Sequence, residues 1–254
     1  MQSTVLITGA TAGIGEATAV ILAQNGYRLI ISGRREEKLD VLEKKLRSQY
    51  NVDVLSLPLD VRNRKDVEDA IKGLPENWNR IDILINNAGL AAGLDFMHEG
   101  SLDDWDCMVD TNIKGLLYVY RAVAPQMVER KSGHVVNIGS IAGREVYEKG
   151  NVYCATKHFV KGITKGMRID MLKHNIKVTN IEPGIADTEF AHVRFKGDKQ
   201  RADKVYEGWT PLHAWDIAEA ILFAITRPAH VNINDMLIMA TDQANVNHIN
   251  KKTI

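Results

Sequence analysis

The chain has 254 residues, of which 45% are hydrophobic, 25% are charged and 6% are aromatic. This composition is that of an ordinary globular domain, and it excludes collagen-like, disordered and disulfide-scaffold proteins. The 32 basic and 32 acidic side chains cancel, so no strong field attracts nucleic acid or an anionic membrane, and we expect neither as a partner.

Short apolar runs alternate with amphipathic helical stretches along most of the chain. The runs are rich in leucine and β-branched residues and lack polar alternation, which is typical of buried parallel strands. The predicted strands are residues 4–7, 29–32, 54–57, 81–85, 135–138 and 177–181. Between them, apolar residues recur at intervals of three and four, as in helices. This alternation predicts one α/β domain over residues 1–254, with a doubly wound parallel sheet of about seven strands and helices on both faces.

Two segments break the alternation. The first, residues 183–210, has little periodicity, several charges and two glycines. Because long irregular stretches in compact domains are usually functional, we expect a substrate lid at about residues 184–210. The second comprises the last twenty residues, which are polar and whose pattern predicts no element.

A glycine-rich segment at residues 8–15 follows the first predicted strand and opens the first helix. Small residues let the backbone approach a pyrophosphate, and a helix N-terminus offers unpaired N–H groups and a positive dipole. The spacing is G-x3-G-x-G rather than G-x-G-x-x-G, and a tight turn without a ligand is the alternative. The strand-turn-helix setting favours nucleotide binding. The residues predicted to bind are Gly9, Thr11, Ala12, Gly13, Ile14 and Gly15.

The end of the second predicted strand indicates which nucleotide binds. An NAD site places an acidic residue there, where it binds the ribose 2′-hydroxyl. This chain instead has Arg34 and Arg35, and two guanidinium groups can bind a 2′-phosphate through charge-assisted hydrogen bonds. A solvated basic pair is the alternative, although cations at the start of a helix are unfavourable. We therefore predict NADP rather than NAD as the cofactor.

Two further strand ends supply cofactor-site candidates. Asp60 and Val61 end the third predicted strand, where an adenine edge would lie, and Asn87, Ala88 and Gly89 end the fourth. The carboxyl ends of parallel strands meet at one edge of a sheet, so we expect these residues to lie together.

Tyr153 and Lys157 are four residues apart on a predicted helix and therefore share one face. A free phenol has a pKa near 10, and a neighbouring ammonium lowers that pKa, which makes Tyr153 a usable acid or base at pH 7. Ser140, at the end of the fifth strand, could hydrogen-bond the reacting oxygen. Asn112 could hold a water that links Lys157 to solvent. Tyr-x-x-x-Lys is common by chance, but here it accompanies a dinucleotide site.

This combination resembles the short-chain dehydrogenase/reductase family over nearly the whole chain. The matching residues are Thr8-Gly9 with Gly13 and Gly15, Asn86-Asn87-Ala88-Gly89, Asn112, Ser140, Tyr153 with Lys157, and Pro183-Gly184 followed by Thr188. The resemblance implies a Rossmann-like domain, hydride transfer at the nicotinamide and a Ser-Tyr-Lys-Asn tetrad. In it Tyr153 is the general acid/base, Lys157 also binds the nicotinamide ribose, and Ser140 orients the carbonyl.

The resemblance extends to the rest of the cofactor site and to assembly. It places Pro183, Gly184 and Thr188 at the cofactor, with Thr188 on the carboxamide or pyrophosphate. It also implies a homotetramer joined through helices at about residues 104–129 and 151–173.

Several longer stretches are similar to one subgroup, the NADP-dependent 3-hydroxy acid dehydrogenases. They are residues 59–64, 82–91, 188–190, 193–197 and 228–234. That subgroup oxidises serine, L-allo-threonine and acids such as 3-hydroxypropionate and 3-hydroxyisobutyrate. Such a substrate brings a carboxylate, for which Arg144 and Arg194 are the candidate ligands, each with a surface charge as the alternative. The segment 144–149 is more charged than in bacterial members.

Other functions stay open at this point. A carbonyl or pterin reductase would run the same chemistry in the opposite direction. A non-catalytic NADP-binding sensor would have no need of Tyr153 with Lys157, and a sugar epimerase usually carries a further substrate domain. The eight histidines show no metal-ligand spacing beside carboxylates, so we predict no metal.

The cellular compartment is inferred from cysteines and leader signals. Cys107 and Cys154 lie in helical patterns, which favours free thiols in a reducing compartment. The N-terminal residues show neither the basic segment nor the cleavage site of a secretory signal, and no apolar run could span a bilayer. We expect a soluble, cytoplasmic protein.

Overall fold

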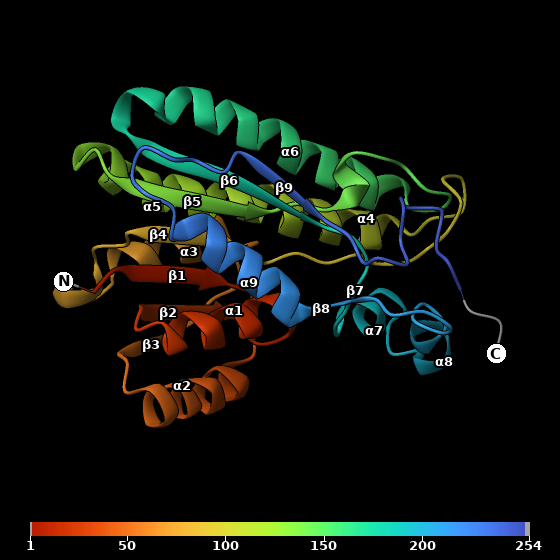
Figure 1. The fold of residues 1–254 in the computed structure, drawn as a ribbon, viewed down its shortest axis with the longest axis horizontal. Helices are drawn as coiled ribbons and strands as arrows, with labels where there is room; N and C mark the ends of the chain where they lie inside the picture. Colours follow the sequence, from red (N-terminus) through yellow and green to blue (C-terminus); the bar gives the residue numbers. More distant parts are fainter. Residues whose placement is uncertain (1, 252–254) are drawn as a thin grey trace.

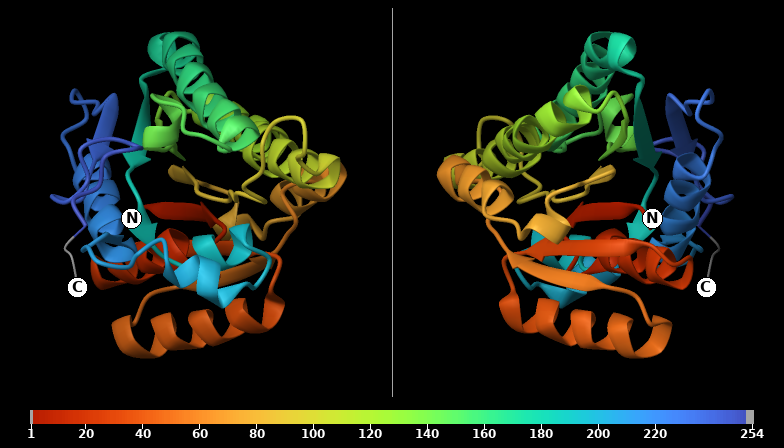
Figure 2. Two further views of the ribbon diagram at one scale, coloured as in Figure 1. Left: turned by 90° about the vertical axis from the view of Figure 1, so that its right-hand side faces the viewer. Right: turned by 90° about the vertical axis from the view of Figure 1, so that its left-hand side faces the viewer.

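The fold is a parallel sheet of seven strands with helices on both faces, seen in a computed structural model that describes residues 2–251 (Figures 1 and 2). The strand order is β3-β2-β1-β4-β5-β6-β9. The strands are β1 (Thr4–Thr8), β2 (Arg28–Gly33), β3 (Val54–Pro58), β4 (Ile83–Asn86), β5 (Gly133–Ile138), β6 (Ile176–Pro183) and β9 (Asp235–Ile238). The predicted fold class is therefore confirmed.

Two layers of helices enclose this sheet. One layer consists of α1 (Gly13–Gln24), α2 (Glu36–Tyr50) and α9 (Ala214–Ile225). The other consists of α3 (Arg64–Lys72), α5 (Leu116–Glu129) and α6 (Asn151–Met171), with α4 (Leu102–Val109) beside α6. A π-helical turn, η2 (Asp110–Gly115), joins α4 to α5. The short 3₁₀ turns are η1 (Glu76–Trp78), η3 (Ile141–Gly143) and η4 (Leu172–His174).

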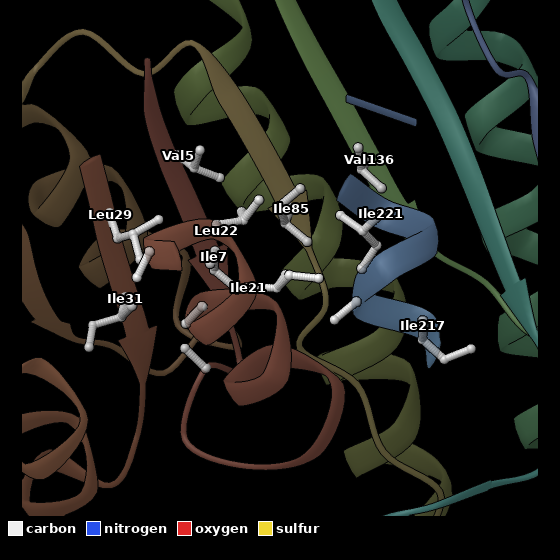
Figure 3. Close-up of a cluster of buried hydrophobic side chains, with 14 of the residues drawn as sticks. Val5, Ile7, Ile21, Leu22, Leu29, Ile31, Ile85, Val136, Ile217 and Ile221 are labelled. Carbon is white, nitrogen blue, oxygen red and sulfur yellow. The ribbon is translucent and has the colours of Figure 1, made fainter. Parts of the chain in front are cut away.

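Side-chain alternation along the central strands creates a separate core on each face of the sheet. In β1, the side chains of Val5 and Ile7 pack toward α1 and α9 (Figure 3). The side chain of Leu6 packs on the opposite face, toward α5. All three are at most 1% exposed. Burying an aliphatic side chain of this size contributes about 1.5–3 kcal/mol. The two cores fix the strands, and hence the positions of the loops at the strand ends.

The segment after β6 is more ordered than its sequence pattern indicates. It contains a two-residue strand, β7 (Ala186–Asp187), that pairs with β8 (Leu212–His213), and two short helices, α7 (Phe190–Arg194) and α8 (Lys199–Asp203). Five residues are too few to show helical periodicity, which is why the sequence suggested an irregular stretch. These elements stand beyond the carboxyl ends of the strands (Figure 1).

Three features of the chain bear on its environment. Within residues 2–251, no helix combines the length and apolarity needed to cross a bilayer. Over the same range, no three His, Cys, Asp or Glu side chains are grouped so as to hold a metal ion. Cys107 and Cys154 are both free thiols.

Candidate active site

A continuous cleft of about 540 Å³ opens at the carboxyl ends of the strands. It lies where the strand order reverses: from β1 the chain proceeds through β2 to β3, and from β4 it proceeds the other way through β5 to β6. Such a switch point is the usual ligand site of open α/β sheets, and the volume is that of an ordinary ligand pocket. The glycine-rich loop lies at one end, and Ser140 and Tyr153 lie at the other.

The glycine-rich loop is built for close approach. Gly9 and Gly13 have φ values of +68° and +54°, a conformation that favours glycine. A Cβ on Gly15 would lie 2.2 Å from the Gly9 carbonyl oxygen, so only glycine fits there. The N-cap residue of α1, Ala12, provides no side-chain hydrogen bond to the first turn. The first N–H groups of α1 are therefore available to a pyrophosphate, and the residues present fit a dinucleotide.

Hydrogen bonds fasten this loop to the end of β4. The Asn87 Nδ2 donates to the carbonyl oxygens of Thr8 and Gly9, at 2.9 and 3.1 Å. In return, the backbone N–H groups of Asn87 and Ala88 donate to the Thr8 Oγ1, at 3.1 and 3.0 Å. The two halves of the sheet are thus joined directly beneath the cleft.

The two arginines after β2 have different surroundings. Arg34 is exposed, lines the cleft and forms no side-chain hydrogen bond or ion pair with the described residues. Arg35 donates from Nε and Nη2 to the Thr11 Oγ1, at 3.1 and 3.0 Å, and from Nη1 to Glu189, at 2.8 Å. Glu189 also accepts from Lys38, and the hydrogen bonds with Lys38 and Arg35 hold the pKa of Glu189 below its usual value.

Asp60 and Val61 line the cleft as predicted, but Asp60 is not free. Its carboxylate accepts hydrogen bonds from the Arg62 guanidinium, the shortest at 2.6 Å. The hydrogen bonds and charge of Arg62 hold the pKa of Asp60 below its usual value. Arg62 was not among the predicted site residues, although it stands within the charged run that follows Asp60.

Tyr153 and Lys157 lie together on one face of α6, only 8% and 7% exposed. The Lys157 Nζ donates to the Ile138 carbonyl oxygen at 2.8 Å and lies 5.9 Å from the centroid of the Tyr153 ring. Burial lowers the pKa of Lys157 to about 8, so its side chain is still mainly cationic at pH 7. The predicted pairing of these two side chains is therefore present.

The environment of the Tyr153 hydroxyl differs from the prediction. Burial raises the pKa of Tyr153 well above its ordinary value near 10, whereas a hydrogen bond with Ser140 and the charge of Arg194 act in the opposite direction. The sequence led us to expect a lowered pKa from Lys157. The protein's own groups instead raise the pKa of Tyr153, because the cost of removing the phenolate from water outweighs the stabilisation by nearby positive charges.

Ser140 and Asn112 are both held firmly. The Ser140 Oγ accepts from the Ala142 N–H at 3.1 Å and lies 3.5 Å from the Pro183 carbonyl oxygen. Asn112, in η2, is 2% exposed, and its amide exchanges two 2.8 Å hydrogen bonds with the backbone of Leu90. The Asn112 side chain is thus engaged with protein, and its water-holding role stays a prediction.

The two candidate carboxylate ligands occupy different places. The Arg194 guanidinium lies 5.3 Å from the Tyr147 ring centroid and 5.7 Å from that of Tyr153, inside the cleft. Arg144 instead pairs with Glu182, a fully buried carboxylate on β6, with 2.6 Å between Nε and Oε2. Arg144 is not among the cleft-lining residues, so the structure does not bring it to the site.

The cleft brings together nearly all of the predicted site residues. Those that line it are Gly9, Thr11, Ala12, Gly13, Ile14, Arg34, Arg35, Asp60, Val61, Asn87, Ala88, Gly89, Ser140, Tyr153, Lys157, Pro183, Gly184, Thr188 and Arg194. Gly15 and Asn112 do not line the cleft but contact residues that do: Gly15 packs against Gly9 and Asn87, and Asn112 accepts a hydrogen bond from the Leu90 N–H. Lining residues that sequence reasoning missed include Tyr147, Glu148, Glu189, Phe190 and Gln243. Two sequence signals pointed toward these residues: the charge of segment 144–149, and the similarity of residues 188–190 to the 3-hydroxy acid dehydrogenases. No such signal marked Gln243.

Known proteins resemble this chain over almost its whole length. A model of the short chain dehydrogenase family matches residues 3–199. The chain is 49% identical over 241 residues to an NADP-dependent 3-hydroxy acid dehydrogenase of Salmonella typhi, covering 94% of this chain and 96% of that protein. It is 43% identical over 250 residues to an NADP-dependent 3-hydroxy acid dehydrogenase of Schizosaccharomyces pombe, covering 98% and 96%.

The fold also has a counterpart among solved structures. The closed form of a serine dehydrogenase complexed with NADP+ matches with a TM-score of 0.91 at 46% identity, covering 96% of this chain and 97% of that one.

Proposed function

This chain belongs to the short-chain dehydrogenase family, and we propose that it is an NADP-dependent oxidoreductase of small 3-hydroxy acids, of the serine, L-allo-threonine or 3-hydroxypropionate type. One observation carries the proposal. Tyr153, Ser140 and the guanidinium of Arg194 lie at one end of a cleft whose other end has a dinucleotide loop and exposed arginine. A site of this kind can accept a hydroxyl proton and hold a carboxylate at the same time.

The cofactor end would hold NADP through four contributions. The N-terminus of α1 and the glycine-rich loop would bind the pyrophosphate, and a guanidinium after β2 would bind the 2′-phosphate. By resemblance to the family, Lys157 would bind the nicotinamide ribose, and Thr188 the carboxamide or pyrophosphate. Bound NADP supplies the hydride acceptor for oxidation, and NADPH the donor for reduction.

At the chemical end, Tyr153 takes the proton of the C3 hydroxyl during oxidation and returns it during reduction. Burial opposes the phenolate, so the charge of Arg194 is needed to make that proton transfer accessible. The ammonium of Lys157, 5.9 Å from the centroid of the Tyr153 ring, acts in the same direction. Ser140 donates a hydrogen bond to the reacting oxygen as charge develops on it. The Ala142 N–H holds the Ser140 Oγ in place, so only the hydroxyl proton has to turn from the Pro183 carbonyl oxygen.

Arg194 is the group that suits the carboxylate. Its Nε donates to the Gly93 carbonyl oxygen at 3.1 Å, and its guanidinium also donates a hydrogen bond to the Tyr147 hydroxyl. These contacts orient the guanidinium, whose remaining N–H groups suit a carboxylate. The adjacent Tyr147 and Tyr153 rings limit the directions from which that contact can form. Oxidation of a 3-hydroxy acid held in this way yields a 3-keto acid, which decarboxylates without further help from protein groups.

A carbonyl or pterin reductase is the second candidate. It is favoured by the apolar contact between Tyr153 and Phe190, whose rings lie edge to face with centroids 5.5 Å apart. An aromatic substrate could pack there in place of an acid. The sensor alternative lacks such support, because a sensor requires neither Tyr153 nor Lys157.

Absorbance of NADPH over a panel of substrates tests the proposal. We expect oxidation of free 3-hydroxy acids with NADP and little turnover of their methyl esters. Arg194→Met should raise KM for the acids and leave KM for the esters unchanged, because only the acids lose a carboxylate contact. It should lower kcat for both, because the charge of Arg194 also favours the Tyr153 phenolate. If esters and simple ketones outrun the acids in the unmodified protein, the reductase alternative replaces this one.

Assembly and location complete the proposal. We propose a homotetramer formed through α4, α5 and α6, since Leu102, Ile169 and Leu172 on these helices and the adjoining turn are 69–74% exposed. Light scattering on the purified protein should give four times the chain mass.

The two free thiols favour a reducing compartment, and we propose that the protein is located in the cytoplasm. Fractionation of cells tests this location.

A further inference from the structure

A charged cluster on the rim of the cleft has no part in the chemistry described so far. It consists of Arg35 and Lys38 at the start of α2 and Glu189 just before α7, and we call it the rim clamp. Glu189 uses both carboxylate oxygens: Oε2 accepts from Arg35 at 2.8 Å and Oε1 accepts from Lys38 at 2.9 Å. Residues more than 150 positions apart are thereby joined across the cleft.

The rim clamp connects the segments that a dinucleotide must touch. Arg35 also donates to the backbone carbonyl and hydroxyl oxygens of Thr11, both at 3.0 Å from Nη2, in the glycine-rich loop. The neighbour of Glu189, Thr188, packs on the same loop, where a Cβ on Gly13 would lie 3.2 Å from the Thr188 Cβ. Closing the clamp therefore holds the segment after β6 against the pyrophosphate loop.

This arrangement separates the two arginines after β2. All three guanidinium nitrogens of Arg35 already have partners in the protein. Arg34 lines the cleft with no side-chain partner among residues 2–251, close enough to Asp60 for its charge to affect that carboxyl. Only Arg34 can turn to a 2′-phosphate without breaking an existing contact.

We propose that Arg34 alone discriminates NADP from NAD, whereas Arg35, with Lys38 and Glu189, is a positioning residue that closes the lid equally on either cofactor. The proposal rests on the NADP use argued above and assigns separate tasks to a pair that the sequence treats as equivalent. A 2′-phosphate that drew Arg35 away from Glu189 would instead open the clamp on binding.

The energies suit a clamp that opens and closes. The three side chains are 44–49% exposed, so each ion pair contributes little to folding, and its loss does not threaten the fold. Because the clamp acts only when the lid is closed, its contribution should appear in how fast a cofactor leaves.

The test compares dissociation constants for NADPH and NADH, and their release rates by stopped-flow fluorescence, in four variants. Arg34→Met should weaken NADPH binding about 10- to 100-fold and NADH binding less than twofold, since one charge-assisted contact is lost. Arg35→Met and Glu189→Gln should each weaken both cofactors about three- to tenfold and speed their release, with an unchanged ratio. Lys38→Met should do the same to a smaller extent.

Matched controls remove the same charges elsewhere. Glu207→Gln alters an exposed glutamate of the same segment, and Arg64→Met an exposed arginine of α3. Neither should change the binding or release of either cofactor.

Three results would overturn the proposal. Arg35→Met that weakens NADPH alone would make Arg35 a reader of the 2′-phosphate. Glu189→Gln that tightens NADPH would make Glu189 a competitor of that phosphate. Rim-clamp variants without effect on either cofactor would leave the clamp without a function. An unmodified protein that prefers NAD would contradict the proposed function, yet the equal losses expected for both cofactors would still test the clamp.

Discussion

At the scale of single residues, Tyr153 is where opposing physical effects meet. Its burial disfavours the phenolate, and the positive charges of Arg194 and Lys157 surround the ring on which that phenolate would form. A side chain in this situation exchanges its proton readily only while those charges are in place. Catalysis should therefore be sensitive to cations that never touch the reacting carbon.

The first prediction concerns the hydroxyl of Tyr153 itself. Tyr153→Phe should reduce turnover by about 10²- to 10⁴-fold, the usual contribution of a general acid/base, while NADPH affinity stays within a few-fold because the ring remains. Steady-state kinetics and NADPH fluorescence titration measure the two quantities. Turnover within tenfold of the unmodified enzyme would exclude the proton-transfer role.

The second prediction concerns pH. Arg194 holds the pKa of Tyr153 lower than burial alone would set it, so Arg194→Met should raise that pKa further. Oxidation needs the deprotonated phenol, so the rising limb of kcat against pH should move to higher pH in this variant. Arg194→Lys keeps the positive charge, so in this variant the rising limb should stay close to its position in the unmodified protein. A limb that does not move in Arg194→Met would show that Arg194 has no electrostatic effect on Tyr153.

At the scale of elements, strands with a strong apolar pattern were predictable and β9 was not. The six predicted strands lie in the interior of the sheet or, like β3, show a clear leucine and valine pattern. In contrast, β9 is an edge strand whose residues are half-buried or, like Leu237, exposed, and a polar segment surrounds it. An interior strand is buried on both faces and therefore has a run of apolar residues that the sequence reveals. An edge strand pairs mainly through backbone hydrogen bonds, which require no particular side chains.

The site shows the same division. Tyr153 and Lys157 were predictable because helix geometry alone places residues four apart on one face. The distinction between Arg144 and Arg194 was not, because it depends on Glu182, which β6 presents beside Arg144. The role of Glu189 was not predictable either, because it depends on the hydrogen bond that Arg35 donates to it across the cleft. Contacts between distant segments leave no local pattern to read.

A third prediction belongs to the pair of strands β5 and β6. His134 on β5 is buried, with its Nε2 2.8 Å from the Thr179 Oγ1 on β6, and burial lowers the pKa of His134 to about 3. The unfolded chain, with a histidine pKa near 6.5, binds this proton more readily, so stability should be full above pH 6.5 and fall as pH decreases toward 3. The slope should reach about 1.4 kcal/mol per pH unit for this one residue.

Urea unfolding between pH 7 and pH 5 measures that slope. His134→Asn should flatten this slope by about one proton per molecule. Equal slopes for His134→Asn and the unmodified protein would mean that His134 does not titrate on unfolding.

At the scale of the whole molecule, the cofactor cleft draws on both halves of the sheet and on the segment beyond β6. A ligand that touches all of them stabilises the folded state as a unit. NADP at about 100 times its dissociation constant should add about 2.7 kcal/mol to the free energy of unfolding.

The fourth prediction follows from that coupling. For a chain of this length the stabilisation corresponds to a rise in Tm of roughly 5–10 °C, measurable by calorimetry. NAD at the same concentration should give a smaller rise, and in Arg34→Met the two cofactors should become alike. An equal rise for NAD in the unmodified protein would contradict the cofactor assignment.

The strand order has a consequence for how such a protein can change over generations. β1, β2 and β3 occupy one side of the sheet and are contiguous in the chain, whereas β4, β5, β6 and β9 occupy the other side. A single recombination event between Pro58 and Ile83 would therefore exchange the nucleotide-selecting half while keeping Ser140 and Tyr153. One obstacle to such a hybrid gene is Glu189, whose partners Arg35 and Lys38 lie in the exchanged half. Another is Asn87, whose partners Thr8 and Gly9 lie there too. Hybrids in which both parents carry Glu189, Arg35 and Lys38 should therefore bind the cofactor about three- to tenfold more tightly than hybrids that lack this trio.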